Sequence, residues 1–438
     1  MQVRYTILLI LLCCFSIATV NAATQISNNG ITWTFDRDYT TGQFANGDYY
    51  VIDPGSGVNI VGITQPNGGS TDGSMINPSS QSSQGYNQNA PSYNATLNVA
   101  RSVSASSPLR ISKGDSLIST IGRTYDSKQT FVGSAAILTV LSTQPPAGSF
   151  RPAYFGTDKS IKYNKSGMDL SKLRRLPNIS GMPSLSSTED SIARPWIDTL
   201  AGWIGRQIHP ANNMPDYGRE MATVIGMAGL MLNSDFSNAE KEKLAIYMCQ
   251  LGIDFYSIAV NGQSGWPADG GHASGRKFPI VIAGSILNNS SMLNVGDLTA
   301  FGEDQQTFYV SQAEVDITNS SAWNPDTRGG TPTPYSTSDI GTPEWGIRHA
   351  YIPAYDNKAW SAMYRTCCTA VAWGGEVLAI EAMGLRAAWN HDALFDYMER
   401  YMNVDGSQWS NWVASMWVRY HNNMGEQKAP PSPPSLDS

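Results

Sequence analysis

The sequence predicts a protein of two parts, an N-terminal antiparallel β-sandwich followed by an all-α (α/α) toroid of helical hairpins. The chain has 438 residues, which is longer than one ordinary hydrophobic core requires. Up to about residue 155, apolar and polar residues alternate in short runs, the period of half-buried strands. From about residue 190, the apolar spacing changes to that of helices.

The first part, residues 23–155, is expected to be the β-sandwich domain. Turn formers such as Asn46-Gly47 and a Gly/Ser/Asn-rich stretch over 66–91 separate its apolar runs. Short strands divided by frequent turns are typical of an antiparallel sandwich. The expected strands are 31–35, 48–52, 58–64, 92–99, 109–112, 116–122 and 135–142.

The second part, residues 188–427, is expected to be the toroid. The segments 221–231 and 366–375 are apolar or small nearly all round, which indicates helices buried on every side. They alternate with amphipathic segments such as 392–400, as an inner ring of helices enclosed by an outer ring requires. We find no internal repeat of fixed period, which disfavours a solenoid. The expected helices are 191–207, 218–233, 237–256 (with a Ser-Asn-Ala-Glu capping box), 273–287, 359–384, 391–402 and 408–421.

The remaining segments are a leader, a linker and a tail. Residues 1–22 are expected to be a secretory signal peptide, with Arg4 before an apolar core and a cut after Ala22. The apolar core is shorter than the ~20 residues that a membrane anchor needs. Residues 156–187 are expected to be a linker, and residues 428–438, rich in Pro and Ser, a disordered tail. The protein is therefore expected to be secreted or periplasmic.

The composition restricts the kind of partner. Charged residues make up 15% of the chain, below the usual ~25%, and the formal net charge is -7. A negative chain does not attract polyanions in bulk, so nucleic acid is not an expected partner and an anionic substrate needs a local group of Arg or Lys. No cofactor or metal is expected, since no ligand spacing points to one.

Three cysteines remain after removal of the leader. Cys367 and Cys368 are neighbours, and neighbouring cysteines close only a strained ring. We therefore expect both to be small buried side chains within a helix, with a single bridge to Cys249 as the alternative.

Three polar segments within the helical part are candidates for a site. The first, 265–277, precedes an apolar helix and holds glycines that let a ligand approach the backbone. Its alternative interpretation is a flexible turn with a capping histidine. The candidate residues are Trp266, His272, Arg276 and Lys277.

The second segment, 342–365, combines proton-transfer groups with carboxylate binders. A phenol and a guanidinium at the start of a buried helix need partners there. The alternative is a structural salt bridge between Glu344 and one of the arginines. The candidates are Glu344, Trp345, Arg348, His349, Tyr364 and Arg365.

The third segment, 209–219, is a loop between two expected helices. Its Asn213, Tyr217 and Arg219 would line the same cleft if the inner helices start at one rim. His209, beside a proline, is interpreted as a helix C-cap, and His391 as structural. The chain has no Gly-x-Ser-x-Gly elbow, P-loop or His-Glu-x-x-His motif, which disfavours serine hydrolases, P-loop nucleotide hydrolases and zinc proteases.

This plan, a leader, a β-domain and a small-residue helical toroid with His, Tyr and Arg in loops at helix starts, resembles the secreted polysaccharide lyases of the α/α-toroid type, among them alginate and other uronan lyases. The resemblance covers most of the chain at the level of architecture. Many such lyases carry the β-domain after the toroid, whereas here it comes first.

The resemblance implies β-elimination of a uronic-acid-containing polysaccharide, and the protein is expected to be a monomer that binds an anionic polysaccharide or oligosaccharide. It implies that Arg348 or Arg276 binds the uronate carboxylate, that His272 or His349 takes the C5 proton, and that Tyr364 donates a proton to the leaving oxygen. Glu344 would orient a histidine or the carboxylate clamp, and Trp266 and Trp345 would stack on sugars.

Two other functions remain open at this point. A glycoside hydrolase on the same toroid would need two carboxyl groups across a sugar, for which Asp269 and Glu344 are the pair. A non-catalytic polysaccharide-binding protein is favoured by the aromatic and Gly/Asn/Ser-rich β-domain.

Overall fold

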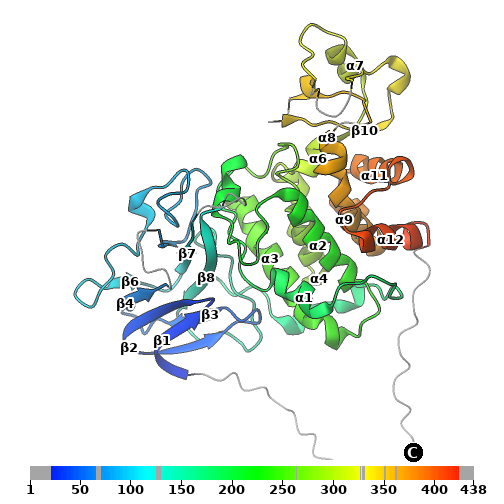
Figure 1. Cartoon of the computed structure of the whole chain (residues 1–438). Helices are drawn as coiled ribbons and strands as arrows, with labels where there is room; N and C mark the ends of the chain where they lie inside the picture. Colours follow the sequence, from blue (N-terminus) through cyan, green and yellow to red (C-terminus); the bar gives the residue numbers. More distant parts are fainter. Residues whose placement is uncertain are drawn as a thin grey trace, which may run out of the picture.

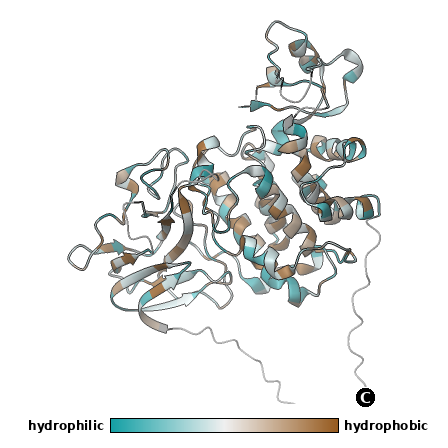
Figure 2. Ribbon diagram, viewed as in Figure 1, coloured by the Kyte–Doolittle hydropathy of each residue, from teal (hydrophilic) through white to brown (hydrophobic). Residues whose placement is uncertain are grey.

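A computed structural model describes residues 21–65, 71–124, 130–262, 264–325, 327, 331–349, 352–360 and 363–423. Figure 1 shows a β-rich part at the N-terminal end beside a helical part, with a small lobe around α7 and β10 projecting from the helices. The apolar residues concentrate in the packed helices and between the sheet and the helices (Figure 2).

The described N-terminal strands form one eight-stranded sheet in the order β5-β7-β8-β3-β2-β4-β6, with β1 paired to β2. β2 is 13 residues long and pairs with β1, β3 and β4, so it joins strands that would otherwise belong to separate sheets. The strands are β1 (Asn21–Asn28), β2 (Ile31–Gln43), β3 (Tyr49–Ile52), β4 (Val58–Thr64), β5 (Gly73–Ile76), β6 (Leu109–Ile111), β7 (Ser116–Gly122) and β8 (Val132–Leu141).

The predicted antiparallel sandwich is wrong, because this sheet is single and mixed. β3 runs parallel to β8, with Tyr49 opposite Leu138, while the other strand pairs of the sheet are antiparallel. The expected strand 92–99 is also wrong: the side chains of Asn94 and Asn98 accept hydrogen bonds from nearby backbone N–H groups and fold the segment into turns and a short 3-10 helix.

The helical part has a core of four helices. α2 packs against α9 and α3 against α4, and the capping box at Ser237 and Glu240 starts α3 as expected. Every residue of α4 is buried, as is nearly all of α9, which explains their lack of a polar face. The helices are α1 (Leu185–Ile192), α2 (Gly218–Leu232), α3 (Asn238–Asn261), α4 (Lys277–Ile286), α5 (Ser290–Leu293), α6 (Gly302–Gln306), α7 (Gln312–Thr318), α8 (Met363–Cys367), α9 (Ala370–Ala382), α10 (Arg386–Trp389), α11 (Asp392–Val404) and α12 (Asn411–Tyr420).

The predicted toroid is wrong as well, because the described helices do not form a regular series of hairpins (Figure 1). Between α4 and α8 the described chain makes only short helices, loops and a two-stranded sheet of β9 (Thr307–Tyr309) and β10 (Pro343–Trp345). The expected helix 191–207 stops at Ile192, before Pro195, and resumes as a 3-10 helix, Trp203–Ile208.

A disulfide divides the expected helix 359–384. Cys367 and Cys368 are bonded to each other, and Cys249 is free and buried, so both expected arrangements of these cysteines are wrong. The bond lies at the junction of α8 and α9, where the backbone leaves the helical path at Thr369. α3 is long and apolar enough to cross a membrane by length and composition, but most of it is buried in the core.

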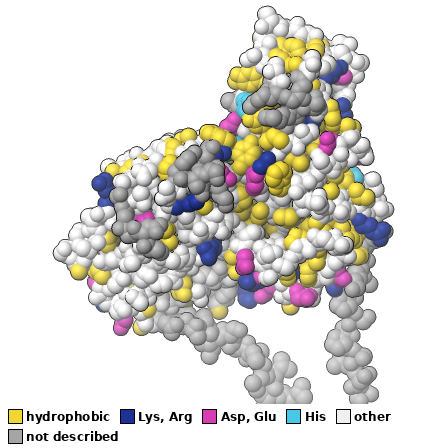
Figure 3. All heavy atoms as spheres, in the orientation of Figure 1, with side chains coloured by type: hydrophobic (Ala, Val, Ile, Leu, Met, Phe, Trp, Pro, Cys, Tyr) yellow, Lys and Arg dark blue, Asp and Glu magenta, His cyan; other side chains and the backbone are white. Residues whose placement is uncertain are grey.

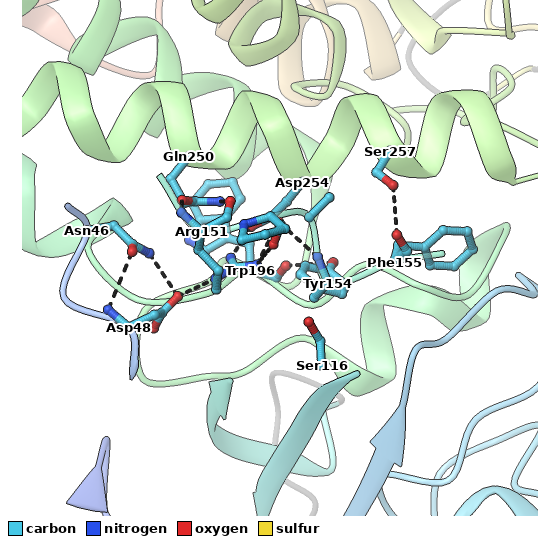
Figure 4. A network of polar contacts seen from close by, with 12 residues as sticks. Asn46, Asp48, Ser116, Arg151, Tyr154, Phe155, Trp196, Gln250, Asp254 and Ser257 are labelled. Atoms are coloured by element: carbon cyan, nitrogen blue, oxygen red, sulfur yellow. Dashed lines mark hydrogen bonds and ion pairs between the residues drawn. The ribbon is translucent and has the colours of Figure 1, made fainter. Parts of the chain in front are cut away.

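Arg151 joins the sheet to the helices. Its guanidinium donates hydrogen bonds to Asp48 at the start of β3, 2.6 Å away, and to both carboxylate oxygens of Asp254 in α3. Its backbone also exchanges hydrogen bonds with the Gln250 side chain (Figure 4). One fully buried cation thus holds a carboxylate from each part of the molecule.

Candidate functional site

The turn Asp269-Gly270-Gly271 is the centre of the site. Gly270 has a φ of 58°, and a Cβ there would lie 2.7 Å from the Tyr364 ring and 3.2 Å from the His349 ring. Its carbonyl accepts a hydrogen bond from the Gln306 side chain at the end of α6, 2.7 Å away. Only glycine therefore lets both rings close over this turn.

Asp269 and His349 form a hydrogen-bonded pair beside Tyr364. The Nδ1 atom of His349 lies 3.1 Å from an Asp269 carboxylate oxygen, and each side chain is about one-third exposed. This hydrogen bond holds the pKa of Asp269 below its usual value. The rings of His349 and Tyr364 meet edge to face with centroids 5.3 Å apart.

The backbone around His349 is held firmly. Arg348 has a φ of 40°, a conformation that non-glycine residues rarely adopt. Its guanidinium donates to Asp356 at 2.8 Å and to Glu314 at 3.3 Å. These ion pairs keep Arg348 in that conformation and so direct the next residue, His349, toward Asp269.

Tyr217 borders the same turn from the N-cap of α2. Its hydroxyl accepts a hydrogen bond from the Gly271 N–H, 3.2 Å away. Burial, with a smaller effect of the nearby Tyr364, raises the pKa of Tyr217 to about 12, so its phenol stays protonated at neutral pH.

Arg219, in the first turn of α2, contacts the backbone of the disulfide-bonded Cys367. It donates to the Cys367 carbonyl at 2.9 Å and forms an ion pair with Glu220. Its guanidinium carbon lies 3.9 Å from the ring centre of Trp409. The Cys368 carbonyl and Cβ pack directly against Gly271, where a Cβ could not fit. The disulfide therefore lies directly behind the turn.

His272 is not part of the exposed cluster. Its Nε2 hydrogen-bonds the Gly202 carbonyl at 2.8 Å, and the ring is buried against Trp203. Burial, helped by the nearby Arg276, lowers the pKa of His272 to about 4. The ring is therefore neutral and has a structural position.

Asp198 accepts hydrogen bonds from two candidate residues of the first predicted segment, 265–277. One of its carboxylate oxygens accepts from Arg276 at 2.9 Å and from the Trp266 indole at 2.8 Å, and the other bonds His209 at 2.9 Å. All of these side chains are buried. Lys277 likewise pairs with Asp304 and donates to the Trp389 carbonyl at 2.6 Å.

Glu344 is the buried partner of two arginines. Arg365 donates to one of its oxygens at 2.8 Å and Arg400 to the other at 3.1 Å. Trp345 is buried beneath Arg365. Asn213 donates to the Arg194 carbonyl at 3.0 Å. Of the residues predicted for the site, the structure thus brings His349, Tyr364, Tyr217 and Arg219 together.

Three members of the cluster were missed or differently assigned from the sequence. Asp269 entered only as half of a hydrolase pair, and Trp409 and the Cys367–Cys368 bond were not expected at a site at all. The sequence signal for Asp269 was its position before two glycines. Its partner His349 lies far away in the sequence, so residue spacing could not predict the pair.

The described residues contain no group of three or more His, Cys, Asp or Glu side chains that could hold a metal ion. A partly open cavity of about 340 Å³ lies elsewhere, lined by residues such as Tyr163, Tyr256 and Met292 between the 150–163 segment and α3. None of the cluster residues lines it.

No family model, curated protein or solved structure matches this chain.

Proposed function

We propose that this chain is an exported polysaccharide lyase that cleaves a uronic-acid-containing polysaccharide by β-elimination. One observation carries the proposal: a histidine, His349, is hydrogen-bonded to a carboxylate and in ring contact with a tyrosine, all at a glycine turn. A proton acceptor and a proton donor side by side are what this reaction requires.

His349 serves as the base. With its Nδ1–H donated to Asp269, its Nε2 carries the lone pair that removes the proton from C5 of the uronate. Asp269 holds this tautomer and stabilises the imidazolium that forms. The electrons of the C5–H bond become the C4–C5 double bond, and the C4–O4 bond breaks.

Tyr364 serves as the acid. Its phenol gives a proton to the departing O4, which leaves as a hydroxyl group. Tyr217, kept protonated by burial, hydrogen-bonds the developing negative charge on the substrate. The imidazolium then loses its proton to solvent and Tyr364 regains one, which returns both groups to their starting state.

Arg219 serves as the carboxylate binder. It lies beside Tyr217 and is one-fifth exposed, whereas Arg276 is enclosed with Asp198 and Arg348 with Asp356. A bound uronate carboxylate takes the place of Glu220 on this guanidinium. The positive charge neutralises the carboxylate, which makes the C5 proton more acidic and easier to remove.

A hydrolase that uses Asp269 and Glu344 has less support. Glu344 is buried and its two carboxylate oxygens accept hydrogen bonds from Arg365 and Arg400, so this carboxyl group is not free to face a sugar.

The test is a panel of uronans, with the ultraviolet absorbance of the unsaturated product and the release of reducing ends measured together. We expect both signals to rise for a uronan, and His349→Gln to abolish both. His421→Gln is the matched control, since His421 pairs with Glu381 at 2.9 Å at the end of α12. Reducing ends without absorbance would replace the lyase by a hydrolase, and retention without either would leave a binding protein.

A further inference from the structure

We infer that Trp203 and Trp409 are sugar-stacking subsites on the two flanks of the acid–base cluster, so that the protein binds an internal stretch of a polysaccharide chain. This inference rests on the proposed function and names the extent and the binding mode of its substrate.

The first observation is the exposure of tryptophan. The chain has 12 tryptophans, and all of them lie among the described residues. Trp203 and Trp409 are the two that are exposed, at 45% and 54%, while the others are buried or partly buried. Exposed aromatic rings indicate a binding site when they adjoin other side chains in one continuous surface.

The second observation is that both rings belong to one row. Trp203 meets Tyr217 edge to face with centroids 6.1 Å apart. The Arg219 guanidinium lies 5.8 Å from the centre of the Tyr217 ring, and Arg219 stacks on Trp409 at 3.9 Å. The row Trp203-Tyr217-Arg219-Trp409 is drawn from three separate parts of the sequence.

The third observation is the position of this row against the catalytic turn. Tyr217, at its middle, bonds Gly271, and the adjoining Gly270 lies beneath Tyr364 and His349. Tyr217 therefore joins the row to the turn that carries the reacting groups. Figure 3 shows hydrophobic, basic and acidic side chains close together where the small lobe and the main body meet.

Charge decides how such a row would bind. Arg206, stacked on Trp203 at 4.0 Å, lies 3.8 Å from Asp216, and Arg219 is paired with Glu220. Each cation already faces an anion, so bulk attraction of a polyanion is weak here. The flanking sugars are therefore held by contact of their apolar faces with the rings, and this contribution depends little on salt.

The binding experiment uses the full chain carrying His349→Gln, so that no turnover occurs. Calorimetric titration with a mannuronate hexamer, a mannuronate dimer and the neutral cello-hexaose separates the subsites. In this background, Trp203→Ala and Trp409→Ala should each weaken hexamer binding by about threefold to tenfold and leave dimer binding unchanged. Trp203→Phe and Trp409→Phe, which keep a ring, should lose less.

Tyr309→Ala is the matched control, because Tyr309 is an exposed aromatic residue on β9 that bonds Asp396 and touches no member of the row. Unchanged hexamer affinity in either tryptophan variant would overturn the two-sided placement, as would failure of both hexamers to bind. If cello-hexaose binds as tightly as the mannuronate hexamer and responds to the same variants, the row is supported and the uronate substrate of the proposed function fails.

Discussion

The Nδ1 atom of His349 lies 3.1 Å from a carboxylate oxygen of Asp269, although 79 residues separate the two in the sequence. No spacing rule could pair them, and the pair defines the site. Tyr364 meets the His349 ring edge to face and the Tyr217 hydroxyl accepts a hydrogen bond from Gly271, so two phenols lie at the same turn.

Asp269→Asn should lower kcat by about 100-fold or more, because an amide can donate to Nδ1 and so favour the tautomer that lacks the basic Nε2. Initial rates of unsaturated product measure the effect, and the melting temperature reports folding. Asp316→Asn on α7, an exposed position, is the control. A variant with wild-type kcat would remove Asp269 from the mechanism.

Tyr364→Phe should lower kcat by roughly 100-fold with little change in KM, since the ring contact with His349 remains and only the proton donor is lost. Tyr309→Phe loses an exposed hydroxyl that bonds Asp396 and should leave the rate unchanged. A rise in KM alone would make Tyr364 a binding residue.

Opening the Cys367–Cys368 disulfide should disturb the site. The Cys367 carbonyl holds Arg219 and Cys368 packs on Gly271, so the double variant Cys367→Ser/Cys368→Ser should lose roughly 10-fold to 100-fold in kcat/KM. A dithiol reductant should act likewise on the wild type, and reoxidation should restore the rate. Cys249→Ala, which removes the free buried thiol, should keep the activity. Full activity after reduction would show that the bond does not position the site.

Arg151→Met should destabilise the fold by about 3 to 5 kcal/mol, because it leaves Asp48 and Asp254 buried without their cation. Urea unfolding followed by fluorescence measures the change. Lys165→Ala breaks the half-exposed pair with Glu242 and should change the free energy of unfolding by less than about 1 kcal/mol. Equal effects of the two changes would contradict the assigned role of Arg151.

Acid should destabilise the protein through His272. Burial lowers its pKa from 6.5 to about 4 in the folded state, so between these values the unfolded chain binds more protons. Stability is then complete above pH 6.5 and falls as the pH drops toward 4, by on the order of 2 kcal/mol between pH 7 and pH 5. His272→Gln should reduce this dependence in urea unfolding at the two pH values. An unchanged slope would mean that His272 is protonated in the fold.

Local signals in the sequence placed most elements. The capping box at Ser237 and the apolar segments of α2, α4 and α9 predicted their helices, because hydrogen-bond capping and burial on all sides act over a few residues. Pro195 lies within the expected helix 191–207, and a proline in a helix interior disfavours helix, so α1 ends at Ile192 before it.

The sequence by itself determined where β-structure gives way to helix, and which polar segments hold His, Tyr and Arg. Tertiary structure decided the rest. It paired β3 with β8 in parallel, bonded Cys367 to Cys368, enclosed Arg276 and Glu344 with buried partners, and left His349 beside Asp269 and Tyr364. The physical reason is the sequence distance over which each interaction acts. Periodicity and capping depend on neighbouring residues, whereas strand order and the partner of each charge depend on which distant segments share a core.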